Sequence, residues 1–292
     1  MKIITVGPEG DYTTITEAVE AAEYECETEV RIAAGVYREK LFIEKKNISL
    51  IGSGRGRTVI EWGDGALDEM PDGTRRGTFR TQTVFLGGEK CTVRDLTIRN
   101  TAGDGDIRGQ ALAVYSDASE VHMDHVEMSS HQDTLFMAPL PKEERQSRGF
   151  FGPRMLSDRK PTRQFFNNCI IRGDVDFIFG GADAVFEGCE IIVYDRGKDI
   201  NGYVTAPCEC PGGTGFVFRN CVIRGENMDM KGTVFLGRPW RPTARASFEN
   251  CRYDDSIHPK RFSGWKSIDE LEPEVVFEER DPLDLGGNPL NL

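Results

Sequence analysis

The chain has 292 residues and a formal net charge of −12, so it lacks the excess of Lys and Arg that nucleic-acid phosphates require, and we expect no nucleic-acid partner. No apolar run approaches the roughly 18 residues of a membrane helix, so we expect no membrane partner. Eight cysteines without a C-x-x-C pair do not suggest a disulfide scaffold or a zinc site, and Cys208-Glu209-Cys210 is only a weak candidate for a metal or a strained bridge.

The N-terminal segment predicts a short strand followed by a helix. The apolar stretch within residues 1–7 is too short for a signal peptide, which leaves a cytoplasmic protein or one whose leader was removed. Over 14–23 the apolar residues share helical spacing and Thr14 with Glu17 forms a capping box, so we expect a short amphipathic helix. Short apolar or alternating runs follow and predict an all-β chain, at 30–33, 41–44, 48–51, 58–60 and 83–86.

Six eight-residue segments from residue 91 onward superpose without gaps and form an internal repeat. The third position of each segment is apolar: Val93, Met123, Phe166, Phe186, Phe218 and Phe248. The sixth position holds Leu96, Val126, Cys169, Cys189, Cys221 and Cys251, each preceded by a residue from a turn-favouring set. Successive sixth positions lie 20 to 43 residues apart, which is about the length of one turn of a parallel β-helix.

This spacing favours a parallel β-helix over a propeller or a sandwich, because an antiparallel sandwich would have a hairpin turn every few residues. We expect one domain over 1–292, with the helix at 14–23 covering an open end of the solenoid. The repeated cysteines then form an interior apolar ladder rather than a redox site. The charged, Pro-rich residues 139–161 read as a surface insertion, and the acidic residues from 269 on are expected to pack along the outside.

The repeat brings two aspartates into the same register. Asp133 lies seven residues after Val126, and Asp176 lies seven residues after Cys169, so they occupy equivalent places on consecutive coils. Strands are spaced about 4.8 Å apart, and two carboxylates that close cannot both ionise at low cost. One is therefore expected to be a protonated general acid and the other an ionised nucleophile. We assign Asp174 to the turn instead.

Other polar residues fall near these acids in the predicted coils. Arg238 can contact a carboxylate through two hydrogen bonds, and Trp240 offers a flat face for a sugar ring. Gln110 lies one coil before Gln132, and two amide donors beside a carboxylate pair suit an oxyanion hole. No G-x-S-x-G elbow is present, so an aspartate-based mechanism is favoured, with His131 read as a wall residue.

At these residues the chain resembles the pectin methylesterases, the pectinesterase family of right-handed parallel β-helices. The matching motifs appear in family order: Gly10-Asp11-Tyr12-Thr13-Thr14-Ile15 with Ala18-Val19, Gly35-Val36-Tyr37-Arg38-Glu39-Lys40, Gly109-Gln110-Ala111, Gln132-Asp133-Thr134-Leu135, Val175-Asp176-Phe177-Ile178-Phe179-Gly180 and Leu236-Gly237-Arg238-Pro239-Trp240. The last three are highly specific together. The resemblance therefore implies an all-β, right-handed parallel β-helix.

The resemblance also implies a role for each site residue. Asp176 would attack the galacturonate methyl ester, and Asp133 would protonate departing methanol and then activate water. Gln110 and Gln132 would bind the oxyanion, while Arg238 would orient Asp176 and keep it charged. No metal or cofactor is implied.

Trp240 and Phe179 would hold the sugar, and Trp265 is a further candidate contact. The chain departs from the family pattern at His131, where an aromatic residue is common, and in the insertion 139–161, which should remodel one wall of the cleft.

The implied substrate is pectin (homogalacturonan) or its oligogalacturonides, acted on by a monomer that family resemblance would place outside the cell. The acidic net charge suggests better action on highly methylated substrate than on its anionic product. Two close carboxylates also serve a glycosidase or a lyase of this fold class, and a thioesterase or acetylesterase using the same site is a further alternative. A carbohydrate-binding solenoid without activity would not need matched aspartates beside an arginine.

Overall fold

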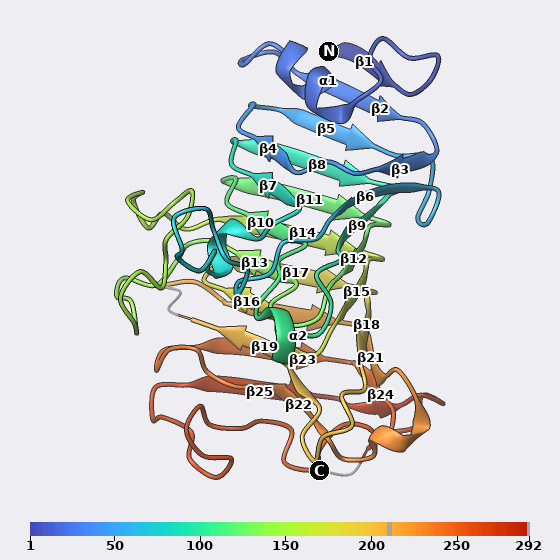
Figure 1. Ribbon diagram of the computed structural model, residues 1–292. Helices are drawn as coiled ribbons and strands as arrows, with labels where there is room; N and C mark the ends of the chain where they lie inside the picture. The colour runs from blue at the N-terminus through green and yellow to red at the C-terminus, as the bar shows by residue number, and fades with distance from the viewer. Residues whose placement is uncertain (209–211, 291–292) are drawn as a thin grey trace.

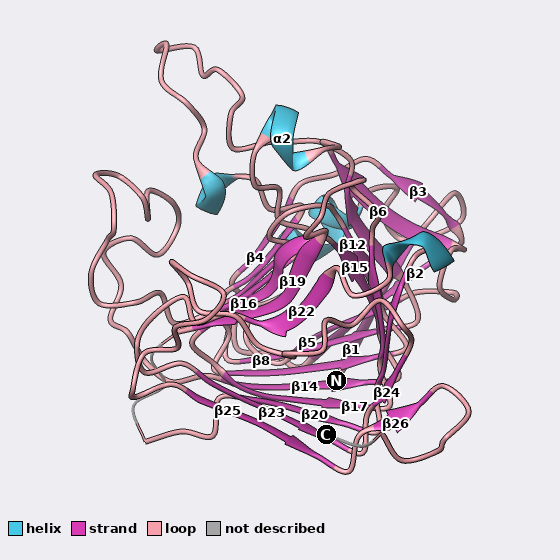
Figure 2. Ribbon diagram, turned by 90° about the horizontal axis from the view of Figure 1, so that it is seen from below, coloured by secondary structure: helices cyan, strands magenta, loops and turns pink. Residues whose placement is uncertain are grey.

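The computed structural model describes residues 1–208 and 212–290 and shows a parallel β-helix (Figure 1). The chain winds through three parallel sheets coil after coil, and Figure 2 shows the sheets enclosing a common core. In the Cys208-Glu209-Cys210 candidate, Glu209 and Cys210 lie outside the described residues, while Cys208 is buried with Sγ near the carbonyl oxygen of Pro139. No helix in the described residues is long and apolar enough to cross a membrane.

Sheet A and sheet B form two sides of the solenoid along its length. Sheet A contains β1 (Lys2–Val6), β2 (Thr28–Ile32), β5 (Ile48–Ile51), β8 (Lys90–Arg94), β11 (Glu120–Asp124), β14 (Arg163–Asn167), β17 (Asp183–Glu187), β20 (Phe216–Arg219), β23 (Arg245–Glu249) and β25 (Val276–Arg280). Sheet B contains β3 (Gly35–Tyr37), β6 (Thr58–Trp62), β9 (Thr97–Asn100), β12 (Glu127–Ser129), β15 (Ile170–Gly173), β18 (Glu190–Val193), β21 (Val222–Gly225), β24 (Arg252–Tyr253) and β26 (Leu283–Asp284).

Sheet C is the third side and is shorter. It contains β4 (Leu41–Ile43), β7 (Val84–Leu86), β10 (Val114–Ser116), β13 (Leu135–Met137), β16 (Val175–Gly180), β19 (Gly202–Pro207) and β22 (Val234–Gly237). Helical turns are few in the described chain: α1 (Ile15–Ala21), α2 (Gly105–Arg108) and the 3-10 turns η1 (Thr78–Arg80) and η2 (Met228–Met230).

The predicted repeat is confirmed by the strand register. The third positions pair across sheet A in the order Val93, Met123, Phe166, Phe186, Phe218 and Phe248. The four phenylalanine rings stack with centroids 4.4 to 4.6 Å apart and planes within 7°. The four cysteines at the sixth position are at most 1% exposed, so they fill the interior as the ladder that the spacing predicts.

The turn-favouring residues before the sixth position all adopt the left-handed conformation. Their φ angles lie between 50° and 60°, at Asp95, His125, Asn168, Gly188, Asn220 and Asn250. Asp, Asn and Gly tolerate this region better than other residues do, so the chain can turn from sheet A to sheet B at the same place in each coil. The repeat therefore depends on the left-handed turn between sheets A and B as well as on the apolar side chains of the core.

The predicted helix is α1, which spans Ile15–Ala21 with Thr14 as its N-cap. The Thr14 hydroxyl accepts the Glu17 N–H, and Glu39 accepts the N–H groups of Ile15 and Thr16. The helix packs over the first coils and covers the N-terminal end of the stack (Figure 1). The solenoid thus shields its apolar end with a capped amphipathic helix.

The C-terminal segment differs from the sequence expectation. Residues from 269 on do not only pack along the outside, because β25 pairs in parallel with β23, and β26 pairs with β24. The side chains of β25 are half-buried or exposed. Its acidic composition therefore did not predict a strand, although the segment forms part of the last coil.

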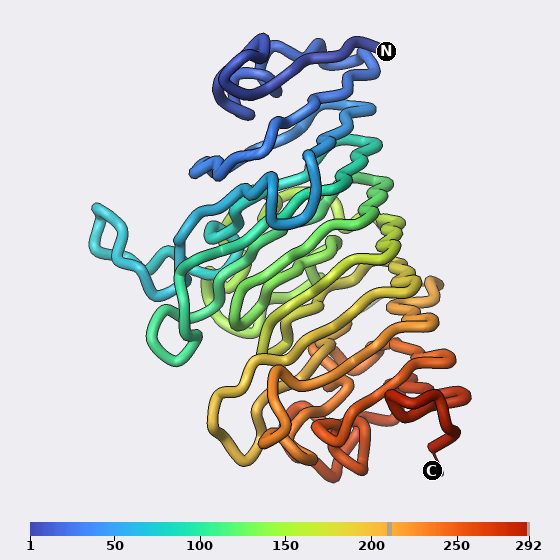
Figure 3. Tube along the Cα trace, turned by 90° about the vertical axis from the view of Figure 1, so that its right-hand side faces the viewer, coloured from blue at the N-terminus to red at the C-terminus, as the bar shows by residue number. Residues whose placement is uncertain are grey.

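The outer face of sheet C is aromatic and is covered by two excursions of the chain. Phe85, Tyr115, Phe136 and Phe179 follow one another in register on successive coils and are almost fully buried. Phe79 from the 63–82 excursion and Phe150 from the 139–161 insertion pack onto this row. The 63–82 excursion projects from the stack of coils (Figure 3), and residues of both excursions line one recess over sheet C.

Candidate active site

The two predicted acids sit on consecutive coils where the chain enters sheet C. Leu135 pairs with Ile178, and the Asp133 N–H donates to the Val175 carbonyl oxygen at 3.1 Å, so Asp133 and Asp176 share one register. Both backbones are left-handed, with φ of 65° at Asp133 and 52° at Asp176. The register with β19 shifts between Val175 and Ile178, and such a bulge re-aims the side chain that it carries.

Both carboxylates are buried in the recess, which separates their protonation behaviour. Asp133 is 8% exposed and Asp176 is 6% exposed. Burial raises the pKa of Asp133 well above its usual range, and the nearby charge of Asp176 raises it further. Burial also raises the pKa of Asp176, but the charge and hydrogen bonds of Arg238 oppose this rise. A proton shared by the pair is therefore held preferentially on Asp133.

Arg238, which follows β22, contacts Asp176 through two hydrogen bonds. Its Nε lies 2.8 Å from Oδ1 and its Nη2 lies 2.7 Å from Oδ2. The guanidinium also lies between two rings, 3.9 Å from the centroid of Tyr203 and 4.4 Å from that of Trp265. These rings limit the motion of the guanidinium, so its two N–H donors remain aligned with the two carboxylate oxygens of Asp176.

The two predicted amides line the same cleft as the acids. The Ala111 N–H donates to the Gln132 carbonyl oxygen at 3.0 Å, which ties the segment after Gln110 to the next coil. Side-chain amides from two successive coils therefore lie beside Asp133 and Asp176, an arrangement that can stabilise negative charge developing on a substrate oxygen.

The two predicted sugar contacts differ in exposure. Trp240 is partly exposed in the cleft, whereas Phe179 is 3% exposed and meets the Trp240 ring edge-on with a centroid distance of 5.6 Å. Phe179 also packs on Phe136 and Phe79, so it forms the floor beneath Trp240. Of the two rings, Trp240 has the larger surface available to a ligand.

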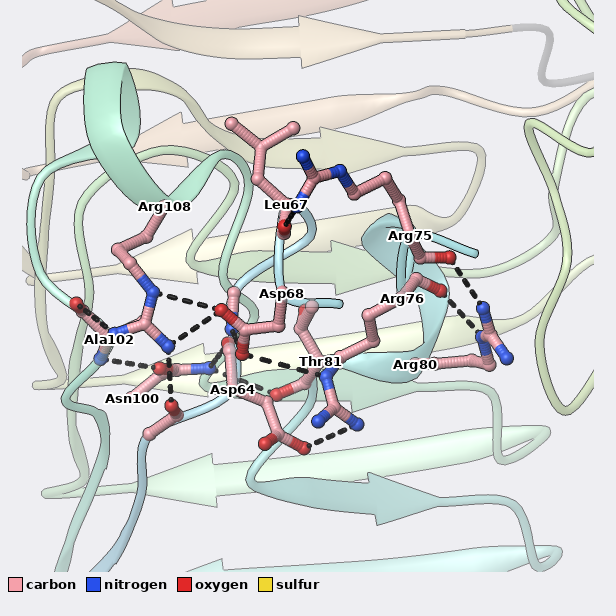
Figure 4. A network of polar contacts seen from close by, with 12 residues as sticks. Asp64, Leu67, Asp68, Arg75, Arg76, Arg80, Thr81, Asn100, Ala102 and Arg108 are labelled. Atoms are coloured by element: carbon pink, nitrogen blue, oxygen red, sulfur yellow. Dashed lines mark hydrogen bonds and ion pairs between the residues drawn. The ribbon is translucent and has the colours of Figure 1, made fainter. Parts of the chain in front are cut away.

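One wall of the cleft comes from the 63–82 excursion, which carries Thr78 and Phe79. Figure 4 shows the polar contacts that fix this excursion to the coil. Arg108 contacts Asp68 through Nε and Nη2 at 2.9 and 2.7 Å, and the buried Asn100 amide donates to the carbonyl oxygens of Asp64, Thr81 and Leu112. Because backbone carbonyls at both ends of the excursion share one donor group, the wall is held at a fixed distance from sheet C.

A further part of the cleft lining comes from the insertion 139–161. Arg145 donates from Nη2 to the Trp240 carbonyl oxygen at 2.6 Å and lies over the Trp265 ring at 4.5 Å. Farther along, Arg154 contacts Asp117 and Glu44, which ties the insertion to the coil. The insertion therefore contributes a cation to the recess, a contribution that its composition alone did not locate.

Several cleft residues were not identified from the sequence. They are Thr78, Phe79, Arg145, Gln146, Gly149, Phe150, Ala206 and Arg241, together with Tyr203 against Arg238. Most lie on excursions without a repeat, so their place depends on tertiary packing. Tyr203 pairs with Val175 on the adjacent strand, next to the register shift between Val175 and Ile178, which the repeat does not predict.

Comparison with known proteins gives a consistent result along the chain. The family model named Pectinesterase matches residues 2–147 and 159–281, and the gap falls inside the insertion. The chain is 35% identical over 279 residues to a probable pectinesterase/pectinesterase inhibitor 64 of Arabidopsis thaliana, covering 89% of this chain and 42% of that protein. It is 32% identical over 274 residues to a pectinesterase of Daucus carota, covering 90% of this chain and 76% of that protein.

Solved structures agree with these relatives. The pectin methylesterase from carrot superposes with a TM-score of 0.79 at 29% identity, covering 97% of this chain and 83% of that one. The chain spans less than half of the length of the Arabidopsis relative and about three quarters of the carrot sequence, so the shared part is the β-helix described above.

Proposed function

Because this chain belongs to the pectinesterase family, we propose that it hydrolyses methyl esters of galacturonate units in pectin or its oligomers and releases methanol. The observation that carries this proposal is the two-point contact of Arg238 with Asp176 beside the buried Asp133. One carboxylate is charged and oriented, while its neighbour favours the protonated form. A nucleophile and an acid are therefore paired without histidine or serine.

In the first half of the reaction Asp176 attacks the ester carbonyl carbon and forms a tetrahedral intermediate. The negative charge moves to the carbonyl oxygen, where the amides of Gln110 and Gln132 donate hydrogen bonds to it. Asp133 then gives its proton to the methoxy oxygen, the carbon–oxygen bond breaks and methanol leaves. The product is an acyl anhydride between Asp176 and the galacturonate.

In the second half Asp133, now ionised, removes a proton from a water molecule that attacks the acyl carbon. The intermediate collapses, the free galacturonate leaves, and Asp176 returns to its charged form against Arg238. The acid and the base are the same residue, so Asp133 releases one proton in the first half and regains one in the second. We propose further that Trp240 contacts the sugar, with Phe179 beneath it, and that the protein acts as a monomer.

Methanol release from methylated homogalacturonan tests this proposal. Wild type should release methanol without new reducing ends or unsaturated products, while Asp176→Asn should lose at least about a thousandfold in kcat/KM. Asp255→Asn, at an exposed aspartate remote from the cleft, is the matched control and should keep wild-type activity. Reducing ends or unsaturated sugars would favour the glycosidase or lyase alternative, and acetate or thiol release without methanol would favour the other esterases.

A further inference from the structure

A second pair of side chains, His131 and Asp174, lies next to the acids on the same two turns. His131 Nδ1 lies 3.0 Å from Asp174 Oδ2. The Asp174 side chain is 1% exposed, while His131 remains partly exposed at 36%. A carboxylate this deeply buried needs a hydrogen-bond donor or a positive charge as its partner. His131 supplies the donor, and when it is protonated it also supplies the charge.

The pair closes the turns that carry the acids. The Asp174 N–H donates to the His131 carbonyl oxygen at 3.1 Å, and Asp174 Oδ1 accepts the Val175 N–H at 2.6 Å. Gln132 and Asp133 follow His131 directly, and Asp176 lies two residues after Asp174. The side-chain contact between His131 and Asp174 therefore joins the two coils next to the left-handed residues Asp133 and Asp176.

The next coil presses on the same turn. The Tyr203 N–H donates to the Asp174 carbonyl oxygen at 3.1 Å, and a Cβ on Gly202 would lie only 1.9 Å from that oxygen. Tyr203 is also the ring against the Arg238 guanidinium. Asp174 is thus linked through one backbone hydrogen bond to Tyr203, whose ring contacts the guanidinium that orients Asp176.

Charge provides the second link. Burial is the main cause of the raised pKa of Asp133 and of Asp176, and the Asp174 charge contributes to both rises. The hydrogen bond with Asp174 raises the pKa of His131 in turn. Other charged or titratable groups around the pair are Asp104 and Glu226, which favour the charged His131, with Tyr194 at 5.2 Å from its ring and Arg172 near Tyr194.

We propose that His131 and Asp174 are positioning residues for the esterase reaction, holding the two turns in register and balancing one charge beside the carboxylate pair. This inference rests on the proposed function. Together the two residues carry no net charge while His131 is protonated. Removing either one alone leaves a charge of known sign next to Asp133 and Asp176.

The two single substitutions therefore have opposite effects on the pH dependence of kcat/KM. His131→Asn retains a donor at the Nδ position but loses the positive charge, so the acid limb should move up by about half a pH unit or more. Asp174→Asn removes the negative charge and leaves the positive charge of His131 where the imidazole is protonated, so the acid limb should move down by a similar amount. The double variant carries no charge at either position, so the acid limb of its pH profile should lie close to that of wild type.

The measurement is methanol release against pH for the four proteins, with thermal unfolding to show that each is folded. A drop in activity without a shift of either limb, or shifts of both single variants in one direction, would overturn the proposal. Wild type that releases no methanol would instead refute the proposed function. If Asp174→Asn does not fold, His131→Asn alone still decides the question by the sign of its shift.

A titration by NMR gives a readout independent of activity. The His131 resonance, identified by its loss in His131→Asn, should titrate above the ordinary value of 6.5 in wild type and lower in Asp174→Asn. A His131 resonance with the same titration in both proteins would show that the hydrogen bond carries no charge and would overturn the pair.

Discussion

The guanidinium of Arg238 holds both carboxylate oxygens of Asp176 while two aromatic rings hold the guanidinium. Asp176 is buried and the Arg238 side chain is only 19% exposed, so the contact replaces hydration that both groups have largely lost. The fork needs two parallel donors in one plane, which arginine has and lysine lacks. The charge on Asp176 therefore depends on the shape of its partner as well as on its sign.

Arg238→Lys tests this dependence. Lysine keeps the positive charge but gives one point of contact, so we expect kcat/KM to fall about a hundredfold with a smaller change in KM. The acid limb should also move up, because weaker opposition to burial leaves the Asp176 pKa higher. Arg224→Lys, at an arginine paired with Glu190 outside the cleft, is the control and should keep wild-type kinetics. Equal kinetics for Arg238→Lys would show that charge alone suffices.

The pKa shifts of the two acids predict a bell-shaped pH profile. Asp176 must be ionised, and its pKa is raised, so activity is lost as pH falls through a value above the ordinary aspartate range. Asp133 must be protonated, and its pKa is raised further, so activity is lost as pH rises through that higher value. Asp133→Asn should lower kcat by about a hundredfold or more and remove the alkaline limb, measured as methanol release across pH. An alkaline limb that persists in this variant would assign it to another group.

Arg145 predicts how the cleft responds to charge on the substrate. The chain carries a net charge of −12, which opposes binding of de-esterified, anionic pectin at low salt. Arg145 places a cation at the cleft wall above Trp265 and reduces this repulsion locally. Arg145→Gln should therefore raise KM several-fold more for partly de-esterified than for fully methylated substrate, with a smaller difference at high salt. Equal changes for both substrates would show that Arg145 acts only through its hydrogen bond to Trp240 and its contact with the Trp265 ring.

A repeated eight-residue pattern, and not a constant spacing, allowed the solenoid to be predicted from the sequence. The Phe and Cys ladders and the left-handed corners repeat at one position in each coil, so aligning the segments also aligned Asp133 with Asp176. The same offset of 43 residues joins His131 to Asp174, yet two unlike residues at equivalent positions form no visible repeat. A comparison of equivalent positions that also looked for a hydrogen-bond donor opposite an acceptor, and not only for identical residues, would have paired His131 with Asp174.

Segments outside the period could not be placed in this way. The walls that carry Phe79 and Arg145 make up excursions whose direction is decided by burial of the aromatic row on sheet C. The short strand β3 was recognised only as a family motif, because its apolar Val36 is exposed and its three residues place no fully buried side chain in the core. Composition misled at the C-terminus, where β25 combines two apolar residues with charged neighbours.

The N-terminal cap depends on Glu39, which lies outside the helix that it stabilises. Its carboxylate accepts the N–H groups of Ile15 and Thr16 and the Thr16 hydroxyl, at 2.6 to 2.9 Å. These amides have no partner within α1, and the helix dipole favours a negative charge there. Glu39→Ala should lower the free energy of unfolding by about 1 to 2 kcal/mol in urea denaturation, with activity retained before unfolding. Glu9→Ala, an exposed glutamate nearby, should be neutral, and an equal loss there would show that general surface charge is responsible.

The phenylalanine stack predicts the largest loss of stability from one interior change. Phe218 lies between Phe186 and Phe248 with centroid distances of 4.4 and 4.6 Å and is fully buried. Phe218→Ala removes ring contacts on both sides and leaves a cavity that rigid neighbouring coils cannot close, at a cost of about 3 to 5 kcal/mol in the free energy of unfolding. Phe165→Ala is the matched control, because this ring stacks on His122 on the outer face of the same sheet and its removal leaves no interior cavity. Urea denaturation that gives similar losses for the two variants would show that the interior ladder is not what holds successive coils together.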